Sequence, residues 1–383
     1  MKTTEFSQDA PGKIIRTLEG YNAFIPDKLP PHLIWSTKLL SKLASAERNI
    51  ARLEEVGKNF PLPHIVVRPF IRKEAVLSSQ IEGTRTTFEQ LLTFEAQKLS
   101  LFGDIEDRQE VHNYVLALDY GLKRLETLPI SVRLIREMHG ILLKGVRGEA
   151  MTPGEVRRSQ NWIGRPGATL TDARYIPPPY EDMADCLFEL EKFIHQESDI
   201  PALIRIGLIH YQFEAIHPFL DGNGRIGRLL ITMLLVAWGL LTQPLLYLSS
   251  FIEKNRTEYY DRLLAVTQKG QWEEWLLFFL DGVDEQAKDA IDCIQALQIL
   301  RLDYQKLFSK ARSRKHLAQM VDYFISTPIS SIKQAKAETG LGNFLTVERY
   351  FQKLEALGII QEVTGKARGR VYRADKILQI LKG

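Results

Sequence analysis

The spacing of apolar residues along the chain predicts a mainly helical protein. Within residues 108–282 the apolar positions recur at intervals of three and four, which places them on one face of a helix. Six predicted helices share this pattern: 111–125, 131–143, 181–194, 202–216, 223–241 and 257–266. Two more, at 33–56 and 65–81, come earlier and are separated by Pro61 and Pro63. We therefore expect a helical core preceded by an N-terminal helical region.

The helical pattern is interrupted at residues 161–179. This stretch holds two short extended segments, 162–164 and 174–176, and ends in three consecutive prolines. Short extended segments closed by prolines are typical of a surface hairpin. We expect a small β-hairpin flap between two helices of the core.

The pattern changes again towards the C-terminus. Residues 283–310 contain no Gly or Pro, which predicts one long connecting helix. The last stretch predicts helices, a strand, a turn of glycine and basic residues, and a returning strand, in this order: 316–325, 331–338, 346–357, 359–363, 365–370 and 371–372. This order is typical of a winged helix-turn-helix domain. The alternative is a small α+β packing module.

These patterns divide the chain into four parts. They are an N-terminal helical region at 1–104, the helical core at 105–285, the connecting helix at 286–312 and the winged-helix domain at 313–383. The fold class we predict is mainly α, with a small hairpin flap in the core and a C-terminal winged helix-turn-helix domain.

Composition agrees with a soluble globular protein. Of the 383 residues, 45% are hydrophobic and 25% are charged, which excludes disordered and collagen-like chains. The longest apolar run, residues 229–241, is too short to cross a bilayer, so we expect a buried helix and no membrane span. The polar N-terminus lacks the apolar region of a secretory signal. Cys186 and Cys293 are too distant to form a disulfide framework, and we expect a cytoplasmic location.

Charge is distributed unevenly along the chain. The net charge is +3, but from residue 311 onward 13 Lys and Arg stand against 6 Asp and Glu, which gives +7 there and −4 for the rest. A basic C-terminal segment on an acidic body is typical of a nucleic-acid-binding appendage. The alternative is a solvated tail whose charge has no partner.

Candidate chemistry is concentrated in residues 217–228, His-Pro-Phe-Leu-Asp-Gly-Asn-Gly-Arg-Ile-Gly-Arg, between two apolar helices. Gly222 and Gly224 let backbone N–H groups approach an anion at the N-terminus of the following helix. Arg225 and Arg228 are three residues apart and share a helix face, so together they suit a diphosphate. The segment therefore predicts a phosphate-binding nest.

Two other side chains of the segment suit phosphate chemistry. Asp221 is a hard oxygen ligand, placed to hold Mg²⁺ that also binds phosphate oxygens. His217 is a base that titrates near neutral pH and could remove a proton from an attacking hydroxyl. The alternatives are a histidine that only packs or caps a helix, and a zinc site formed by His210, His217 and Asp221. No P-loop motif occurs.

The segment resembles the signature of the Fic family, in which His-Pro-Phe and Gly-Asn-Gly-Arg flank an acidic residue and a second Arg follows. It matches at every defined position, and the resemblance extends over most of residues 60–285. Fic proteins are helical enzymes that typically transfer AMP from ATP to a Ser, Thr or Tyr hydroxyl of a target protein. The resemblance therefore implies a protein adenylyltransferase that uses ATP and Mg²⁺ and acts on a target protein.

The resemblance also implies roles for individual residues. His217 would be the base, Asp221 the magnesium ligand and Arg228 the partner of the γ-phosphate. The α- and β-phosphates would lie on Gly222, Asn223, Gly224 and Arg225. The adenine would lie near Tyr259 and Tyr260, although either could instead be a core tyrosine. The flap, through Tyr175, Ile176 and Pro177, would dock the target by strand addition.

A second motif, residues 78–83, resembles the family's inhibitory sequence. Ser78 and Glu82 lie four apart on one helix face, and Gly83 is a natural helix stop. We expect Glu82 to pair with Arg228 and so restrain the enzyme. The alternative is that Ser79 and Glu82 form a capping box at a helix start. In some family members this glutamate helps water remove AMP, so a bifunctional enzyme stays open.

A hypothesis from another class is a DNA-binding regulator whose Fic core senses ATP. In that case six basic side chains of the winged helix would face phosphates: Lys333, Lys336, Arg349, Lys353, Arg368 and Arg370. Transfer of another nucleotide-linked group, self-modification and a homodimer are further possibilities that the sequence leaves open.

Overall fold

The computed structural model describes residues 1, 3–97, 105–165 and 167–383. The first six helices are α1 (Thr37–Asn59), α2 (Pro63–Ile81), α3 (Phe88–Gln97), α4 (Ile105–Arg124), α5 (Val132–Leu142) and α6 (Tyr180–His195). They are followed by α7 (Ala202–Ile216), α8 (Asn223–Ala237), α9 (Ser249–Lys254), α10 (Arg256–Lys269) and α11 (Trp272–Leu307). The last four helices are α12 (Arg314–Ser326), α13 (Ile332–Thr339), α14 (Phe344–Ala356) and α15 (Asp375–Lys382). The predicted mainly helical fold is confirmed.

Helices α7 and α8 form the centre of the core. Most residues of α7 are apolar, and the helix is buried on almost all sides. Helix α8 contains most of the apolar run at 229–241 and is buried in the same way. Within the described residues no helix is both long and apolar enough to span a bilayer. The two helices thus hold the intervening loop, residues 217–222, on a rigid support.

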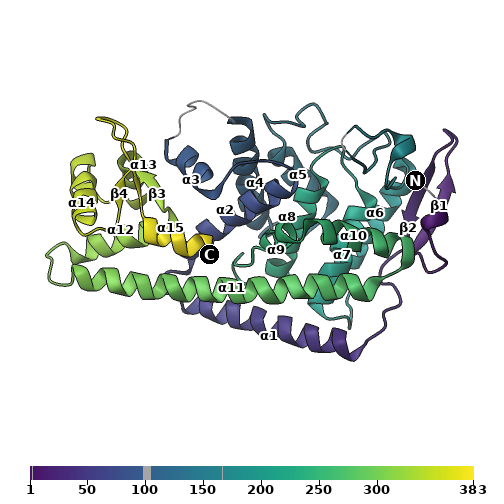
Figure 1. Ribbon diagram of the computed structural model, residues 1–383, viewed down its shortest axis with the longest axis horizontal. Helices are drawn as coiled ribbons and strands as arrows, with labels where there is room; N and C mark the ends of the chain where they lie inside the picture. Colours follow the sequence, from purple (N-terminus) through teal and green to yellow (C-terminus); the bar gives the residue numbers. More distant parts are fainter. Residues whose placement is uncertain (2, 98–104, 166) are drawn as a thin grey trace.

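A long helix runs along one side of the molecule. Helix α11 lies beside α1, and the pair forms a layer beneath the other helices (Figure 1). The predicted long helix at 283–310 is present as part of α11, but its predicted start is wrong, because α11 begins at Trp272 and continues through Gly282. A Cβ on Gly282 would lie 2.7 Å from the ring of Phe251. Gly282 therefore allows close packing rather than ending a helix.

An N-terminal β-hairpin was not predicted. Strands β1 (Gly12–Arg16) and β2 (Asn22–Pro26) pair antiparallel, and Gly12 faces Pro26. The turn between them uses Gly20 at φ +87°. The backbone N–H of Phe24 donates to the carbonyl of Ile176, 3.0 Å away, so the hairpin rests on the flap.

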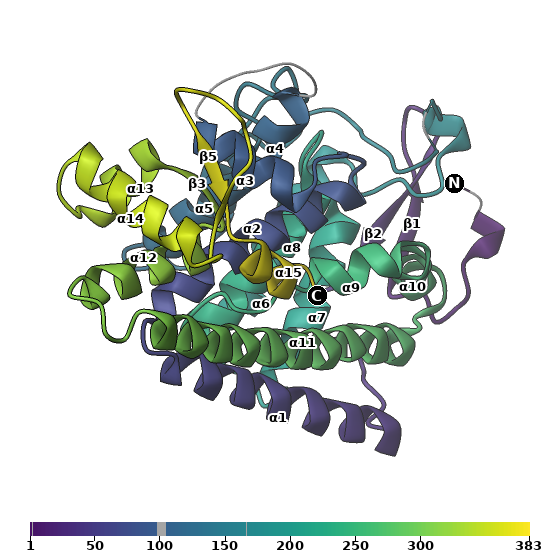
Figure 2. The same ribbon diagram turned by 60° about the vertical axis from the view of Figure 1, so that its left-hand side comes forward.

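Residues 314–383, here named the C-terminal module, form a compact unit at one end of the molecule (Figure 2). Strands β3 (Ile329–Ser331), β4 (Gln361–Glu362) and β5 (Val371–Arg373) form an antiparallel sheet in the order β3-β5-β4. The three predicted helices and both predicted strands are present, whereas β3 and α15 were missed. The predicted boundary at 104 and 105 adjoins residues 98–104, which lie outside the described residues.

The C-terminal module packs against the N-terminal helices. Arg68 of α2 forms an ion pair with Glu338 of α13. The hydroxyl of Ser331 donates to the carbonyl of Ala96 at 3.1 Å. The module therefore touches the helix that ends at the predicted inhibitory motif.

Candidate active site

The loop between α7 and α8 is held in a strained shape. Helix α7 ends at Ile216. Its C-cap residue His217 is left-handed, with a φ of 49° and a ψ of 60°, a conformation that costs a non-glycine residue about 1–2 kcal/mol. The side-chain amide of Asn161 donates to the carbonyls of His217 at 3.2 Å and Phe219 at 2.7 Å. Asn223 accepts from the N–H of Phe219 at 2.9 Å and donates to its carbonyl at 2.7 Å. These amide groups fix the loop from both sides.

The imidazole of His217 is in the tautomer and charge state that a base requires. Its Nδ1 lies 3.3 Å from the carbonyl of Glu214, which can only accept, so Nδ1 carries the hydrogen and Nε2 keeps a lone pair. Burial lowers the pKa of His217 to about 4. The ring is therefore neutral at physiological pH.

The start of α8 has the features of an anion site. Gly222 is the N-cap residue of α8, with a φ of 79°, and as a glycine it has no side chain with which to cap the helix. The N-terminal N–H groups and the helix dipole together favour an anion here. The side chain of Asn223 is already used to close the loop, so its backbone N–H is the group that it offers to a phosphate.

Arg225 is buried and paired. It is 1% exposed and lies 3.2 Å from Glu110 and 3.4 Å from Asp221. Glu110 is itself 1% exposed, and burial raises its pKa although Arg225 opposes the shift. Glu110 was not singled out from the sequence, because nothing in its position on α4 distinguishes it from neighbouring acidic residues.

Arg228 contacts the predicted inhibitory motif. Its Nη2 donates to Glu82 at 2.6 Å and to the carbonyl of Ser78 at 3.0 Å, and its Nε donates to the Ser78 hydroxyl at 2.8 Å. Burial opposes ionisation of Glu82, but Arg228 lowers the pKa of Glu82 overall. The structure thus brings together the two residues whose pairing was expected.

The capping-box alternative for this motif is wrong. Ser79 and Glu82 lie at the C-terminal end of α2, where Glu82 is the C-cap residue, and not at a helix start. Gly83 follows with a φ of 101°. This conformation ends the helix and suits glycine, as expected from the sequence.

Glu214 is a further acidic group near Arg228. Its Oε1 is buried without a hydrogen-bond partner among the described residues, and a Cβ on Gly227 would lie 2.3 Å from it. Burial raises the pKa of Glu214 to about 8, so this carboxyl is mostly protonated at neutral pH. The sequence placed it on a predicted helix without any sign of this environment.

The two predicted adenine-binding tyrosines occupy different environments. Tyr259 is 1% exposed, and its hydroxyl lies 2.8 Å from Nε2 of His210. The ring of Tyr259 packs in the core, which fits the core-tyrosine alternative, and a role of Tyr259 at the adenine stays a prediction. Tyr260 is partly exposed, and Arg256 lies over its ring at 5.9 Å.

The flap is a minimal hairpin with buried side chains. Ile163 and Tyr175 form an antiparallel bridge, and the Tyr175 hydroxyl donates to the carbonyl of Ala215 at 2.6 Å. The side chains of Tyr175, Ile176 and Pro177 are all buried. These side chains are therefore not exposed for contact with a target, and the carbonyl of Ile176 already accepts from the N–H of Phe24.

Asp221 is suited to a hard metal ion. Its side chain is 35% exposed, and one carboxylate oxygen accepts from the N–H of Gly222 at 2.6 Å. A single carboxylate beside an anion nest fits Mg²⁺, which keeps waters and shares phosphate oxygens. The zinc alternative is not supported, because no cluster of three His, Cys, Asp or Glu occurs in the described chain and His210 is bound to Tyr259.

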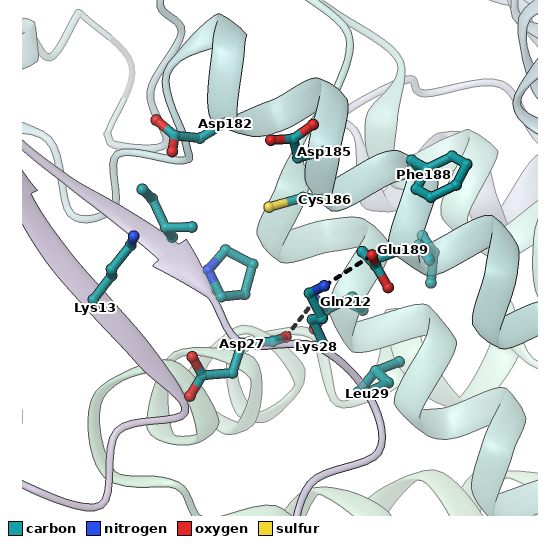
Figure 3. Close-up of a pocket in the computed structure, with 13 residues that line it drawn as sticks. Lys13, Asp27, Lys28, Leu29, Asp182, Asp185, Cys186, Phe188, Glu189 and Gln212 are labelled. Carbon is teal, nitrogen blue, oxygen red and sulfur yellow. Dashed lines mark hydrogen bonds and ion pairs between the residues drawn. The ribbon is translucent and has the colours of Figure 1, made fainter.

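A separate cavity of about 460 Å³ lies between β2 and α6 (Figure 3). Its wall includes Asp182, Asp185 and Cys186, together with Lys28, which pairs with Glu189 at 2.8 Å. Burial raises the pKa of the Cys186 thiol to about 11, which makes it unreactive. The lining contains no residue of the loop and is not part of the candidate active site.

The basic residues expected to contact DNA all lie on the surface of the C-terminal module. All six side chains are exposed: Lys333, Lys336, Arg349, Lys353, Arg368 and Arg370. Two of them make local contacts, Lys353 with the Ser313 hydroxyl at 3.1 Å and Arg370 with the Lys366 carbonyl at 3.0 Å.

Comparison with protein families identifies two adjacent regions. Residues 40–123 match the Fic/DOC family N-terminal region, and residues 129–235 match the Fic/DOC family. Protein adenylyltransferase Fic of Drosophila persimilis is 26% identical over 273 residues, which cover 68% of this chain and 48% of that protein. The same protein of Drosophila melanogaster is 28% identical over 212 residues, covering 54% and 39%. The chain thus spans less than half of these relatives.

Solved structures share the fold. A Fic family protein from Desulfovibrio desulfuricans G20 aligns with a TM-score of 0.58 at 19% identity, over 90% of this chain and 98% of that one. Fic-1 (aa134 - 508) from C. elegans aligns with a TM-score of 0.53 at 20% identity, over 67% and 74%. At this level of identity the comparison supports the fold alone.

Proposed function

The chain carries a Fic/DOC family N-terminal region and a Fic/DOC family domain, and we propose that it is an ATP-dependent protein adenylyltransferase. The proposed reaction moves AMP from ATP to a Ser, Thr or Tyr hydroxyl of a target protein and releases pyrophosphate. The observation that supports it best is the neutral His217 next to the N-terminus of α8, which begins at a glycine. A base beside an anion site is what attack of a hydroxyl on a phosphate requires.

His217 acts on the attacking hydroxyl in this proposal. Because Nδ1–H is held by the Glu214 carbonyl, Nε2 takes the proton as the oxygen bonds to the α-phosphorus. The bond from the α-phosphorus to the bridging oxygen breaks, and pyrophosphate leaves with that electron pair. The target keeps AMP on its oxygen.

The start of α8 holds the nucleotide phosphates. The N–H groups of Asn223 and Gly224 and the guanidinium of Arg225 cradle the α- and β-phosphates. Gly222 joins them only after Asp221 releases its N–H. The guanidinium of Arg225 must then contact both Glu110 and the phosphates. Asp221 holds Mg²⁺, which when bound neutralises phosphate charge.

Glu82 restrains the enzyme in this proposal. Arg228 is the partner of the γ-phosphate, and its Nη2 is occupied by Glu82 and Ser78. ATP can place its γ-phosphate on Arg228 only after Glu82 leaves. The same carboxylate could orient water for removal of AMP, so a bifunctional enzyme is the nearest alternative.

The exposure of side chains around the site indicates where the adenine and the target would bind. Tyr260, the more exposed of the two tyrosines, would line the adenine site. The target would pair with the main chain of the flap, in the manner of an added strand. We further propose a cytoplasmic location; self-modification and a homodimer are additional proposals.

A second candidate function is DNA binding by the C-terminal module. The order of its helices and its antiparallel sheet support a winged helix. Helix α14 lies at the outer end of the molecule, and all six basic side chains are exposed (Figure 1). Duplex DNA should then bind with an affinity that falls steeply with salt, and the K333A/K336A variant should show a smaller salt slope. Mobility on a DNA gel that does not depend on salt would contradict this function.

The proposed transfer reaction is tested by two substitutions. Glu82→Gly should increase the incorporation of labelled AMP into protein, and His217→Ala should abolish it. Unchanged labelling in both variants would contradict the assignment.

A further inference from the structure

We propose that Arg157 is a positioning residue that couples the flap to the backbone of His217. The proposal rests on the proposed function, because that function makes His217 the catalytic base. Arg157 lies just before the flap in sequence, within a pair of adjacent arginines, and nothing in that pattern distinguishes it.

Arg157 is buried among backbone carbonyls. It is 0% exposed. Its Nε donates to the carbonyl of His217 at 3.0 Å, and its Nη2 donates to Pro178 at 2.5 Å and more weakly to Ile216 at 3.5 Å. Its Nη1 reaches the carbonyl of Ser159 at 3.4 Å. One guanidinium thus joins the end of the flap, the end of α7 and the candidate catalytic residue.

The charge of Arg157 is solvated by these carbonyls. No carboxylate forms an ion pair with it in the part of the chain that the structure describes. Burial lowers its pKa to about 10, so the group stays positive at neutral pH. A buried charge without a counterion is costly unless fixed dipoles replace water around it. That cost indicates a specific task for this position.

The hydrogen bonds of Arg157 suit a connection between the flap and the backbone of His217. His217 is in a left-handed conformation, which its surroundings must hold in place. The backbone N–H of Arg157 also donates to the carbonyl of Pro218 at 2.9 Å, so both its main chain and its side chain fix the residues at the end of α7. The same side chain binds Pro178, at the end of the flap. A shift of the flap when a target docks therefore acts on the position of the base.

The proposed coupling requires the several N–H donors of a guanidinium group. A lysine keeps the charge but has one ammonium that cannot reach carbonyls on three separate segments at once. Arg205 offers a matched control. It also donates to helix-end carbonyls, those of Phe193 at 2.8 Å and Gln196 at 3.0 Å, and it lies 12 residues before His217 on α7, about 18 Å along the helix.

The first test is hydrogen exchange on the full chain. Arg157→Lys should lower the protection of residues 161–179 and of 217–222 together, by about tenfold or more, because charge-assisted bonds to both segments are lost. Arg205→Lys should leave both segments unchanged. Normal protection in either segment of a folded Arg157→Lys protein would overturn the proposal. If that variant does not fold, Arg157→Gln, which keeps two N–H donors, takes its place with the same expectation.

The second test separates positioning from structure. In the Glu82→Gly protein, Arg157→Lys should lower the rate of AMP self-transfer at saturating ATP by about tenfold and leave the ATP dissociation constant unchanged. Loss of ATP binding instead would make Arg157 a purely structural residue. If the Glu82→Gly protein transfers no AMP to itself, the proposal of self-modification fails, and hydrogen exchange still decides the coupling.

Discussion

Removal of Glu82 should strengthen the binding of ATP but not of AMP. Glu82 holds Nη2 of Arg228 at 2.6 Å, and Arg228 is 2% exposed while Glu82 is 29% exposed. A charge-assisted hydrogen bond of this kind is worth about 1.5–3 kcal/mol. A γ-phosphate that must displace this contact loses about that much, so Glu82→Gly should raise ATP affinity by roughly ten- to a hundredfold.

Comparison of ATP with AMP shows whether Glu82 acts through the γ-phosphate. AMP has no γ-phosphate and does not require Arg228, so its affinity should be the same in both proteins. Glu82→Gln keeps a hydrogen-bonding group without the charge and should fall between the native protein and Glu82→Gly. Glu137→Gln is the control, because Glu137 pairs with Arg124 and Arg133 on the surface instead.

Isothermal titration calorimetry with ATP and then AMP, each with Mg²⁺, measures these affinities. The reasoning is refuted if ATP and AMP gain equally, since Glu82 would then block the whole pocket. It is refuted too if neither gains, since Arg228 would then not bind the γ-phosphate.

Two further predictions concern buried groups. Because burial raises the pKa of Glu214 to about 8, above an unfolded value of about 4.3, the folded protein holds an extra proton between these pH values. This group therefore lowers the free energy of unfolding as pH rises from 4 to 8, by up to ~1.4 kcal/mol per pH unit. The urea midpoint of the native protein should fall between pH 6.5 and 8, and that of Glu214→Gln should not show this decrease. Tyr259→Phe should lower stability by about 1–3 kcal/mol, because it leaves His210 without its partner, and should leave ATP affinity unchanged. Tyr260→Ala should weaken ATP binding. If calorimetry shows that only the Tyr259 variant loses ATP affinity, Tyr259 is the adenine contact instead.

Residues of one short segment were the easiest to predict. The loop could be recognised because its glycines, arginines, aspartate and histidine follow one another between two apolar helices, so their proximity needs no tertiary information. The contact of Glu82 with Arg228 was also expected, from one helix-face pattern and the resemblance to a family motif. Local periodicity similarly predicted most helices, because burial of one face repeats every three to four residues.

Features that depend on tertiary packing were missed. Glu110 and Arg157 lie on different segments from the loop and reach it only in the folded chain. The N-terminal hairpin is short and is covered in part by the flap, so its alternation is weak. A glycine often ends a helix, but Gly282 lies within α11, where the lack of a side chain lets the helix pack against Phe251.

The coupling of the C-terminal module to the candidate site is a consequence of the fold. Helix α2 contacts the module through Arg68 and Glu338 and ends at Glu82, which contacts Arg228. The module therefore contacts the same helix that leads to Glu82. This arrangement links the two candidate functions physically.

Intact-mass analysis of the purified Glu82→Gly protein with ATP and Mg²⁺ tests the central claim most directly, with Glu82→Gly/His217→Ala as the control. We predict a gain in mass of one or more AMP groups in the first protein and none in the second. Equal gains in both would contradict the role of His217 as the base. A gain of phosphate in place of AMP would contradict the transfer of AMP itself.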